Sequence, residues 1–275
     1  MMKDVVQEYW HEILSGNGLS DFNALWDLKT EWFEPPNIRR GGWSGVCFHH
    51  LNLPDGGQVG VFIKRQENHV KRTWKHPFRG IATCQREYDN LRRMQRWGIP
   101  VPEVVYFACR REEKRTRAIL ITRELSGFKS LNHFFRPGQA EGRLRRHIMK
   151  TVACTLKDFH SHNFQHSSLY PKHILLRRDP DDEQSIQVVL IDWEKARRRM
   201  ASLMAALNDL DIFYRHFPSV SRSEKILFWK YYWSAGRQFY PVVISGFRQV
   251  LARRIRKKQT EKEARRRRSK SAAYP

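Results

Sequence analysis

The segment VVLIDWE, residues 188–194, decides the fold class of this chain. Its first four residues are apolar and favour β-structure, so they predict a buried strand. Asp192 follows directly, and a strand of this kind delivers a carboxylate to a cleft, as a hard cation such as Mg²⁺ requires. An aspartate at a strand end can also merely cap a turn. The neighbouring segments must therefore distinguish the two interpretations.

The stretch HSSLYPKHILL, residues 166–176, lies upstream of this predicted strand. Ile174–Leu176 and Val188–Ile191 are short apolar runs, and the acidic, proline-containing residues 177–185 separate them. This pattern predicts a small β-hairpin. His166, Ser168 and His173 then lie in the loop that precedes it.

The first third of the chain is rich in β-signals. Val46–Leu51 and Gln58–Lys64 flank the sequence PDGG at 54–57, whose glycines allow a tight turn, so they predict antiparallel neighbours. Helical periodicity follows over Thr83–Trp97. Val104–Cys109 and Ala118–Thr122 predict two further strands.

The rest of the chain changes to helical periodicity. Leu144, Ile148, Val152, Leu156 and Phe159 recur mostly at four-residue steps and predict a buried helix face. An aromatic-rich pattern from residue 203 onward predicts more packed helices. We therefore expect an α+β fold with a small N-terminal antiparallel β lobe, carrying one helix, and a larger, mainly helical C-terminal lobe.

Two features of the β lobe suit phosphate binding. Gly41, Gly42, Ser44 and Gly45 lie just before the hairpin, where glycines let backbone amides approach a phosphate and a serine hydroxyl adds a donor. A plain surface turn would have the same sequence. Lys64 is the second feature, because it ends an otherwise apolar strand and must reach either solvent or an anion.

The predicted helix 83–97 offers Lys64 an acidic partner. Glu87 is four residues before Leu91 and so belongs to the inward face, where it can bind the lysine through a charge-assisted hydrogen bond. Asp89 is the alternative partner. Two unconnected surface charges are the simpler interpretation.

Taken together, these motifs resemble the lipopolysaccharide kinase family of the InaA type, related to Kdo and heptose kinases, within the protein-kinase-like superfamily. The resemblance extends from about Arg39 to Arg215. Its marks are GGWSGV at 41–46, IK at 63–64, REY at 86–88, GIPVP at 98–102, SLYPKH at 168–173 and IDWEKA at 191–196.

The resemblance implies a protein-kinase-like bilobal fold that uses ATP and Mg²⁺. It makes Lys64 the phosphate-binding lysine, Glu87 its helix partner and Asp192 the principal Mg²⁺ ligand. Glu124 would lie at the hinge that contacts adenine through its backbone. His173 would stand at the metal-binding asparagine position of the catalytic loop.

The resemblance also implies an acid that braces the catalytic loop from a neighbouring helix, and both Asp209 and Asp211 fit that role. His166 belongs to the loop itself. Within the cluster His160, His162, His166 and His173, zinc binding is an alternative, but no cysteine or HExxH pattern supports it.

One position departs from the family pattern. Ser168 stands where the catalytic aspartate is expected, and a serine is not a base at neutral pH. We hypothesise that Glu194 supplies the missing carboxylate, as a second metal ligand or as the base. A local salt bridge from Glu194 to Arg197 or Arg198 is the alternative.

The function implied is phosphorylation of a Kdo or heptose hydroxyl in the lipopolysaccharide inner core, with the core or a lipid A precursor as acceptor. The alternative is a nucleotide-binding pseudokinase that serves as a stress-related scaffold, which the serine at 168 favours. We expect four regions: an N-terminal helical extension (1–30), a nucleotide-binding lobe (31–125), a C-terminal lobe (126–251) and a polybasic tail (252–275).

The net charge of +23 points to an anionic partner. Residues 252–275 contain 11 Lys and Arg against 2 Glu, so they contribute 11 − 2 = +9. Such a tail suits an anionic membrane surface, although a solvated helix end has the same composition. Nucleic acid is disfavoured as a partner, because no RRM, zinc-finger or OB pattern accompanies the charge.

Composition excludes several other classes of protein. A hydrophobic fraction of 40% is too high for a disordered chain. The longest apolar runs are far shorter than the roughly 20 residues of a membrane span, and the first residues do not resemble a secretory signal. Four scattered cysteines fit reduced thiols. We expect a cytoplasmic protein, peripheral at the inner membrane.

Overall fold

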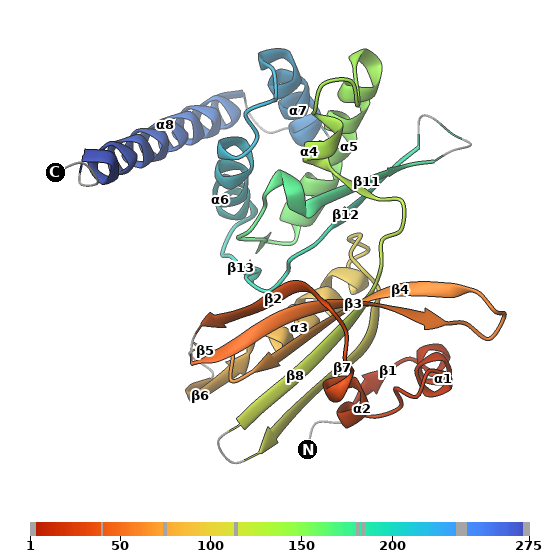
Figure 1. Cartoon of the computed structure of the whole chain (residues 1–275). Coiled ribbons are helices and arrows are strands. Elements are labelled where there is room, and N and C mark those ends of the chain that lie inside the picture. The colour runs from red at the N-terminus through yellow and green to blue at the C-terminus, as the bar shows by residue number, and fades with distance from the viewer. Residues whose placement is uncertain are drawn as a thin grey trace. The chain divides into compact units, whose positions relative to one another are not determined.

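The computed structural model describes residues 4–39, 41–73, 76–112, 115–179, 182, 185–234 and 241–271. They form two compact units (Figure 1). The first unit comprises the residues up to Gly127 together with Ile191–Lys195, and the second comprises Phe128–Leu190 and the residues from Ala196 onward. Each unit has its own β-structure and its own buried hydrophobic residues.

A six-stranded antiparallel sheet forms the centre of the first unit, in the order β1-β7-β8-β4-β3-β2. Its strands are β1 (Val5–Val6), β2 (Trp32–Arg39), β3 (Gly42–Asn52), β4 (Gln58–Glu67), β7 (Val104–Glu112) and β8 (Arg115–Arg123). The predicted hairpin is confirmed, since β3 pairs with β4 and Val46 lies opposite Lys64. The two strands predicted after the helix are confirmed as parts of β7 and β8.

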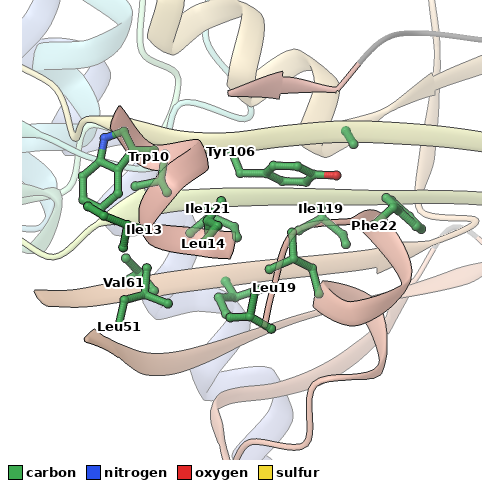
Figure 2. Packing of buried hydrophobic residues seen from close by; sticks show 14 of the residues in the cluster. Trp10, Ile13, Leu14, Leu19, Phe22, Leu51, Val61, Tyr106, Ile119 and Ile121 are labelled. Carbon is green, nitrogen blue, oxygen red and sulfur yellow. The ribbon is translucent and has the colours of Figure 1, made fainter. Parts of the chain in front are cut away.

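Two short N-terminal helices, α1 (Glu8–Gly16) and α2 (Phe22–Asp27), cover one face of this sheet (Figure 2). Trp10 and Ile13 of α1 are at most 2% exposed and belong to one cluster with Val61 and Ile121 of the sheet. The Asp21 carboxylate caps α2 by accepting hydrogen bonds from two backbone N–H groups. The region expected as an N-terminal extension thus contributes buried side chains to the hydrophobic core of the first unit. Its boundary at residue 30 stays a prediction.

The helix α3 (Thr83–Arg96) packs against β7 and β8. The ring of Tyr88 stacks on Phe107 of β7, with 4.3 Å between the ring centroids. The prediction of a helix over 83–97 is confirmed, with its end one residue earlier. A separate hairpin of β5 (Val70–Thr73) and β6 (His76–Ala82) leads into it.

The second unit is mainly helical, as predicted. Its helices are α4 (Leu131–Phe134), α5 (Gly142–Ser161), the 3₁₀ helix η1 (Pro171–His173), α6 (Ser202–Arg215), α7 (Arg222–Ser234) and α8 (Pro241–Ser271). On α5, Ile148, Val152, Leu156 and Phe159 are all 0% exposed, which confirms the predicted buried face. Among the described residues, no helix combines the length and the apolar composition that a membrane span requires.

Two small sheets complete the second unit. One contains β9 (Lys129–Ser130), β11 (Ile174–Arg178) and β12 (Ile186–Leu190), in the order β12-β11-β9, and the other pairs β10 (Phe164–Gln165) with β13 (Arg197–Arg198). The predicted hairpin is confirmed by the antiparallel pairing of β11 and β12. It ends two residues before Asp192.

The predicted basic tail begins inside α8 and not after it. This helix runs continuously from Pro241 to Ser271, so the expected boundary at 251/252 falls within regular structure. The last residues of the predicted tail, 272–275, lie outside the described residues. The boundary therefore stays a prediction.

Candidate active site

Lys64 lies on the face of the sheet that α3 covers. Side chains alternate along a strand, and Val61 and Ile63 of β4 belong to the cluster under α1 and α2. Lys64 therefore points to the opposite face, where its Nζ lies 2.7 Å from Glu87 Oε2 and 3.3 Å from Glu194 Oε2. The expected ion pair is present. Asp89, the alternative partner, instead accepts a hydrogen bond from Gln85.

The electrostatics of this cluster favour a charged lysine. Burial alone would lower the pKa of Lys64, but the carboxylate of Glu87, with smaller contributions from Cys84 and Glu194, raises it above its ordinary value. Burial raises the pKa of Glu87, Lys64 opposes that shift, and Asp192 and Glu194 add to it. Glu87 thus senses two further carboxylates as well as the ammonium. A cation bound here would relieve that repulsion.

The segment Ile191–Lys195 carries two of these carboxylates and belongs to the first unit. Its backbone is tied to α3, because the Asn90 side chain donates a 2.9 Å hydrogen bond to the Trp193 carbonyl. Asp192 has φ +68°, a left-handed conformation that aspartate and asparagine tolerate better than most residues. Glu87 and Asn90 lie one turn apart on α3, so a single helix positions both Lys64 and the aspartate segment.

Asn90 had no role in the sequence interpretation, and its position yields a prediction. We expect Asn90→Ala to weaken the binding of MgATP several-fold and to destabilise the first unit by about 1–3 kcal/mol, because the Trp193 carbonyl loses a buried partner. Calorimetric titration and denaturant unfolding measure the two effects. Arg92→Ala, an exposed site on the same helix, is the matched control and should change neither.

The glycine-rich stretch mostly forms a strand and not a loop. Gly42, Ser44 and Gly45 belong to β3, and only Gly41, with φ +77°, lies in the turn after β2. A Cβ atom on Gly42 would come within 2.0 Å of the Glu67 carbonyl oxygen, and one on Gly45 within 2.6 Å of the Trp32 ring. Close packing, against backbone at Gly42 and against the Trp32 ring at Gly45, thus accounts for these two glycines. Their contact with phosphate stays a prediction.

Two predicted nucleotide contacts have other partners in the first unit. The Ser44 hydroxyl accepts a 3.0 Å hydrogen bond from Gln66 Nε2. Glu124, directly after β8, donates its backbone N–H to the Gly60 carbonyl at 2.8 Å. Its carbonyl is therefore the backbone group to consider for the predicted adenine contact.

Asp209 of α6 braces the loop in the second unit. One of its oxygens accepts the His166 N–H at 2.6 Å, and the other accepts the Ser167 N–H at 2.8 Å. Ser167 has φ +67°, so these bonds hold a backbone conformation that costs energy. The choice between Asp209 and Asp211 is thereby decided for Asp209.

Asp211 instead holds α8. Its carboxylate, 1% exposed, pairs with Arg215 one turn further along α6 and with Arg254 and Lys258 of α8. Two residues of an α-helix that are separated by one position point to nearly opposite sides. Asp209 and Asp211 therefore serve different neighbours.

A buried chain of hydrogen bonds extends from Asp209 to α7. His160 Nε2 lies 3.2 Å from Asp209, and His160 Nδ1 lies 2.8 Å from the Tyr232 hydroxyl. An ionised carboxylate only accepts, so His160 carries its proton on Nε2 and Nδ1 accepts from Tyr232. Burial and Asp209 raise the pKa of Tyr232, which keeps this donor protonated. His160 thus has a structural role that the zinc alternative did not anticipate.

The loop residues His166, Ser168 and His173 lie near one another. Ser168 donates its backbone N–H to His166 Nδ1 at 3.3 Å, and His173 donates Nδ1–H to the Ser168 carbonyl at 2.8 Å. The second bond makes Nε2 the acceptor nitrogen of a neutral His173, which is the form of a histidine metal ligand. The Ser168 side chain is 1% exposed, and its Oγ has no hydrogen-bond partner among the described residues.

The charged lysine and the carboxylates of the first unit fit a nucleotide with a bound divalent cation. Mg²⁺ is typically held by one or two carboxylates, with phosphate oxygens and water completing its ligands. Within the part of the chain that the structure describes, no three His, Cys, Asp or Glu side chains form a ready metal cluster. Asp192 and Glu194 stay the predicted Mg²⁺ ligands, and the charged Lys64 beside Glu194 suits a phosphate.

The sequence profile described as "Lipopolysaccharide kinase (Kdo/WaaP) family" matches residues 23–232. The chain belongs to this family. Protein InaA of Escherichia coli (strain K12) is 30% identical over 209 residues, which cover 74% of this chain and 91% of InaA. Among solved structures, "WaaP in complex with acyl carrier protein" matches with a TM-score of 0.67 and 21% identity, covering 93% of this chain and 99% of that one. The fold is protein-kinase-like, as predicted.

Membership of the lipopolysaccharide kinase family supports phosphate transfer to lipopolysaccharide, with ATP as the donor. The residues predicted to serve nucleotide and metal binding, Lys64, Glu87, Asp192 and Glu194, gather in the first unit. The loop residues and Asp209 gather in the second. Their individual roles stay predictions.

Proposed function

We propose that this chain transfers the γ-phosphate of ATP to a Kdo or heptose hydroxyl of the lipopolysaccharide inner core, at the cytoplasmic face of the inner membrane. The observation that carries the proposal is the partly buried Lys64–Glu87 ion pair beside Glu194, in a chain of the lipopolysaccharide kinase family. Phosphoryl transfer depends mainly on positioning and charge neutralisation. This cluster can provide both.

Each residue has a proposed task in nucleotide binding. Lys64, held by Glu87, neutralises phosphate charge, and Gly41 leaves the turn open for a backbone approach. Asp192 is the principal ligand of Mg²⁺, with Glu194 of the same unit as a further candidate ligand. The bound Mg²⁺ would supply positive charge to the phosphates. Glu124 contacts the adenine through its carbonyl.

The catalytic loop positions the acceptor without an ionisable base at residue 168. Asp209 fixes the backbone of His166 and Ser167, so the loop is rigid before the acceptor arrives. General-base help is typically worth about 10²–10⁴-fold. We therefore expect a slow kinase whose rate arises from positioning.

A pseudokinase remains the second candidate function, because the Ser168 hydroxyl is buried and unpartnered. A hydroxyl that is 1% exposed does not reach a substrate without a change in the loop. A regulatory protein that binds nucleotide would need Lys64 and Asp192 but no base. The two candidates therefore agree on nucleotide binding and differ in turnover.

Thermal unfolding with and without MgATP tests the proposal. A ligand at 100 times its Kd stabilises the folded state by about 2.7 kcal/mol, so MgATP should raise the Tm by several degrees. A lipid A–Kdo acceptor should add to that shift and should become phosphorylated. Stabilisation without turnover on any acceptor would favour the pseudokinase, and no stabilisation by MgATP contradicts both.

Glu194 gives a separate prediction. If it is a second metal ligand, Glu194→Gln should lower turnover about 10-fold or more and raise the Mg²⁺ concentration needed for half-maximal rate. If it acts as the base, turnover should fall without a change in the Mg²⁺ requirement. Full activity in Glu194→Gln, with Asp192→Asn inactive, would show that Glu194 only pairs with its neighbours. The control is Glu67→Gln. Glu67 is a carboxylate of β4 that pairs with Arg117 and has no proposed role in catalysis.

The polybasic end of the chain is proposed to contact the anionic membrane surface that carries the acceptor. Of its described side chains, Arg253, Arg256 and Lys257 are exposed, while Arg254 and Lys258 bind Asp211. Each exposed cation near an anionic surface is worth about 1 kcal/mol. Release from anionic vesicles in the triple variant Arg253→Gln/Arg256→Gln/Lys257→Gln, which spares the anchoring pair Arg254 and Lys258, would support this contact.

A further inference from the structure

A second surface of the second unit combines cations with exposed apolar side chains. It lies where β13 leads into α6, and we call residues 197–204 the basic–apolar segment. Met200 is 94% exposed, Leu203 38% and Met204 45%, and Arg197 and Arg198 are exposed beside them. Single exposed apolar residues are normal, but here three lie within five positions and next to two arginines.

The backbone of this segment is firmly held. β13 pairs with β10, so Arg198 lies opposite Phe164. Arg199 donates its backbone N–H to the Asn163 carbonyl at 2.7 Å and its Nε–H to Gln165 at 2.5 Å. Since β10 continues directly into His166, the segment adjoins the catalytic loop. The backbone that carries the exposed apolar side chains is thus held by hydrogen bonds to β10 and the residue before it.

Positive charge is crowded at this surface. Burial and the charge of Arg197 lower the pKa of Arg199, Asp209 opposes the shift, and Arg254 of α8 adds to it. Arg254 reaches Asp211 of α6 at 3.7 Å, so α8 brings its cations to the same helix that begins in the segment. Crowded cations of this kind are relieved by an anionic partner.

We propose that the basic–apolar segment docks on an anionic phospholipid bilayer, with Met200, Leu203 and Met204 entering the headgroup boundary and Arg197 and Arg198 contacting lipid phosphates. An interfacial site needs apolar side chains flanked by cations, and flexible methionines adapt to an irregular environment. Exposed apolar side chains beside the cations favour a lipid surface over a partner that offers negative charge alone. Docking here would bring the catalytic loop to the lipid surface, and only this consequence rests on the proposed function.

The test is co-sedimentation with phosphatidylcholine vesicles that contain or lack phosphatidylglycerol. The wild type should bind the anionic vesicles. Met200→Asp should weaken that binding about tenfold or more, because it removes an apolar side chain that would enter the bilayer and adds a negative charge. The double variant Arg197→Gln/Arg198→Gln should weaken it to a similar extent. Ile226→Asp, a 53% exposed site on α7 of the same unit, is the matched control and should bind as the wild type does.

Three results would overturn the proposal: no vesicle binding by the wild type, unchanged binding by Met200→Asp, or equal losses in Met200→Asp and Ile226→Asp. Binding to a small acidic protein that the arginine variant loses and Met200→Asp keeps, without vesicle binding, would assign the surface to a protein partner instead. Circular dichroism checks that each variant is folded. Stabilisation by MgATP, measured without vesicles, should be the same in Met200→Asp and the wild type, so failure of docking is distinguishable from failure of the kinase proposal.

Discussion

Asp192→Asn is expected to lower ATP-dependent phosphate transfer by about 10²–10³-fold, which is one of the two largest effects that we expect. The change removes the charge of the proposed principal Mg²⁺ ligand. Asparagine tolerates the positive φ of this position, so the backbone and the hydrogen bond from Asn90 to the Trp193 carbonyl should persist. Initial rates at saturating ATP, with denaturant unfolding in parallel, measure activity and stability separately.

The matched control for this prediction is Asp89→Asn. Asp89 is a partly buried carboxylate of the same unit, and it is hydrogen-bonded to Gln85 within α3. Its loss should leave the rate within about twofold, since we assign it no contact with nucleotide. An Asp192→Asn protein as active as the wild type, or an Asp89→Asn protein as inactive as Asp192→Asn, would contradict the assignment.

The second large effect is expected at Asp209. Asp209→Ala should lower the free energy of unfolding by about 3 kcal/mol or more, because the N–H groups of His166 and Ser167 and the Nε2–H of His160 all lose their acceptor in a buried setting. Turnover of the remaining folded protein should also fall, since the loop loses its brace. Urea unfolding and rates normalised to the folded fraction measure both.

Asp211→Ala is the control that separates loss of the loop's brace from a general loss of stability. Asp211 is equally buried on α6, but it holds Arg215, Arg254 and Lys258. Its loss should destabilise the attachment of α8 and leave the rate per folded molecule close to that of the wild type. A larger loss of normalised turnover in Asp211→Ala than in Asp209→Ala would reverse our assignment of the two residues.

The sequence was most informative where one periodicity determined which way a side chain points. Lys64 ends an otherwise apolar strand, which predicts solvent or an anion at its side chain, and the four-residue step from Glu87 to Leu91 places Glu87 on the inward face. The 2.7 Å ion pair results from those two patterns. The order of strands and helices followed in the same way, since each is a continuous local signal.

Other features depended on contacts between distant segments, which no local pattern reveals. Asp209 and Asp211 are alike in sequence, and only the packing of α6 decides which faces the loop and which faces α8. Gly42 and Gly45 resembled a phosphate loop, but their lack of a side chain is also required by the nearby Glu67 carbonyl and Trp32 ring. Asn90 had one local signal: a polar residue three positions from Glu87 on a helix face that is otherwise buried.

Transfer of labelled γ-phosphate from ATP to purified Kdo–lipid A by the wild-type protein is the most direct test of the kinase assignment. Our account predicts slow, Mg²⁺-dependent incorporation of label into the sugar, which Asp192→Asn lowers by about 10²–10³-fold. Absence of incorporation with Kdo-bearing and heptose-bearing acceptors alike, in a protein that MgATP stabilises, would contradict the account.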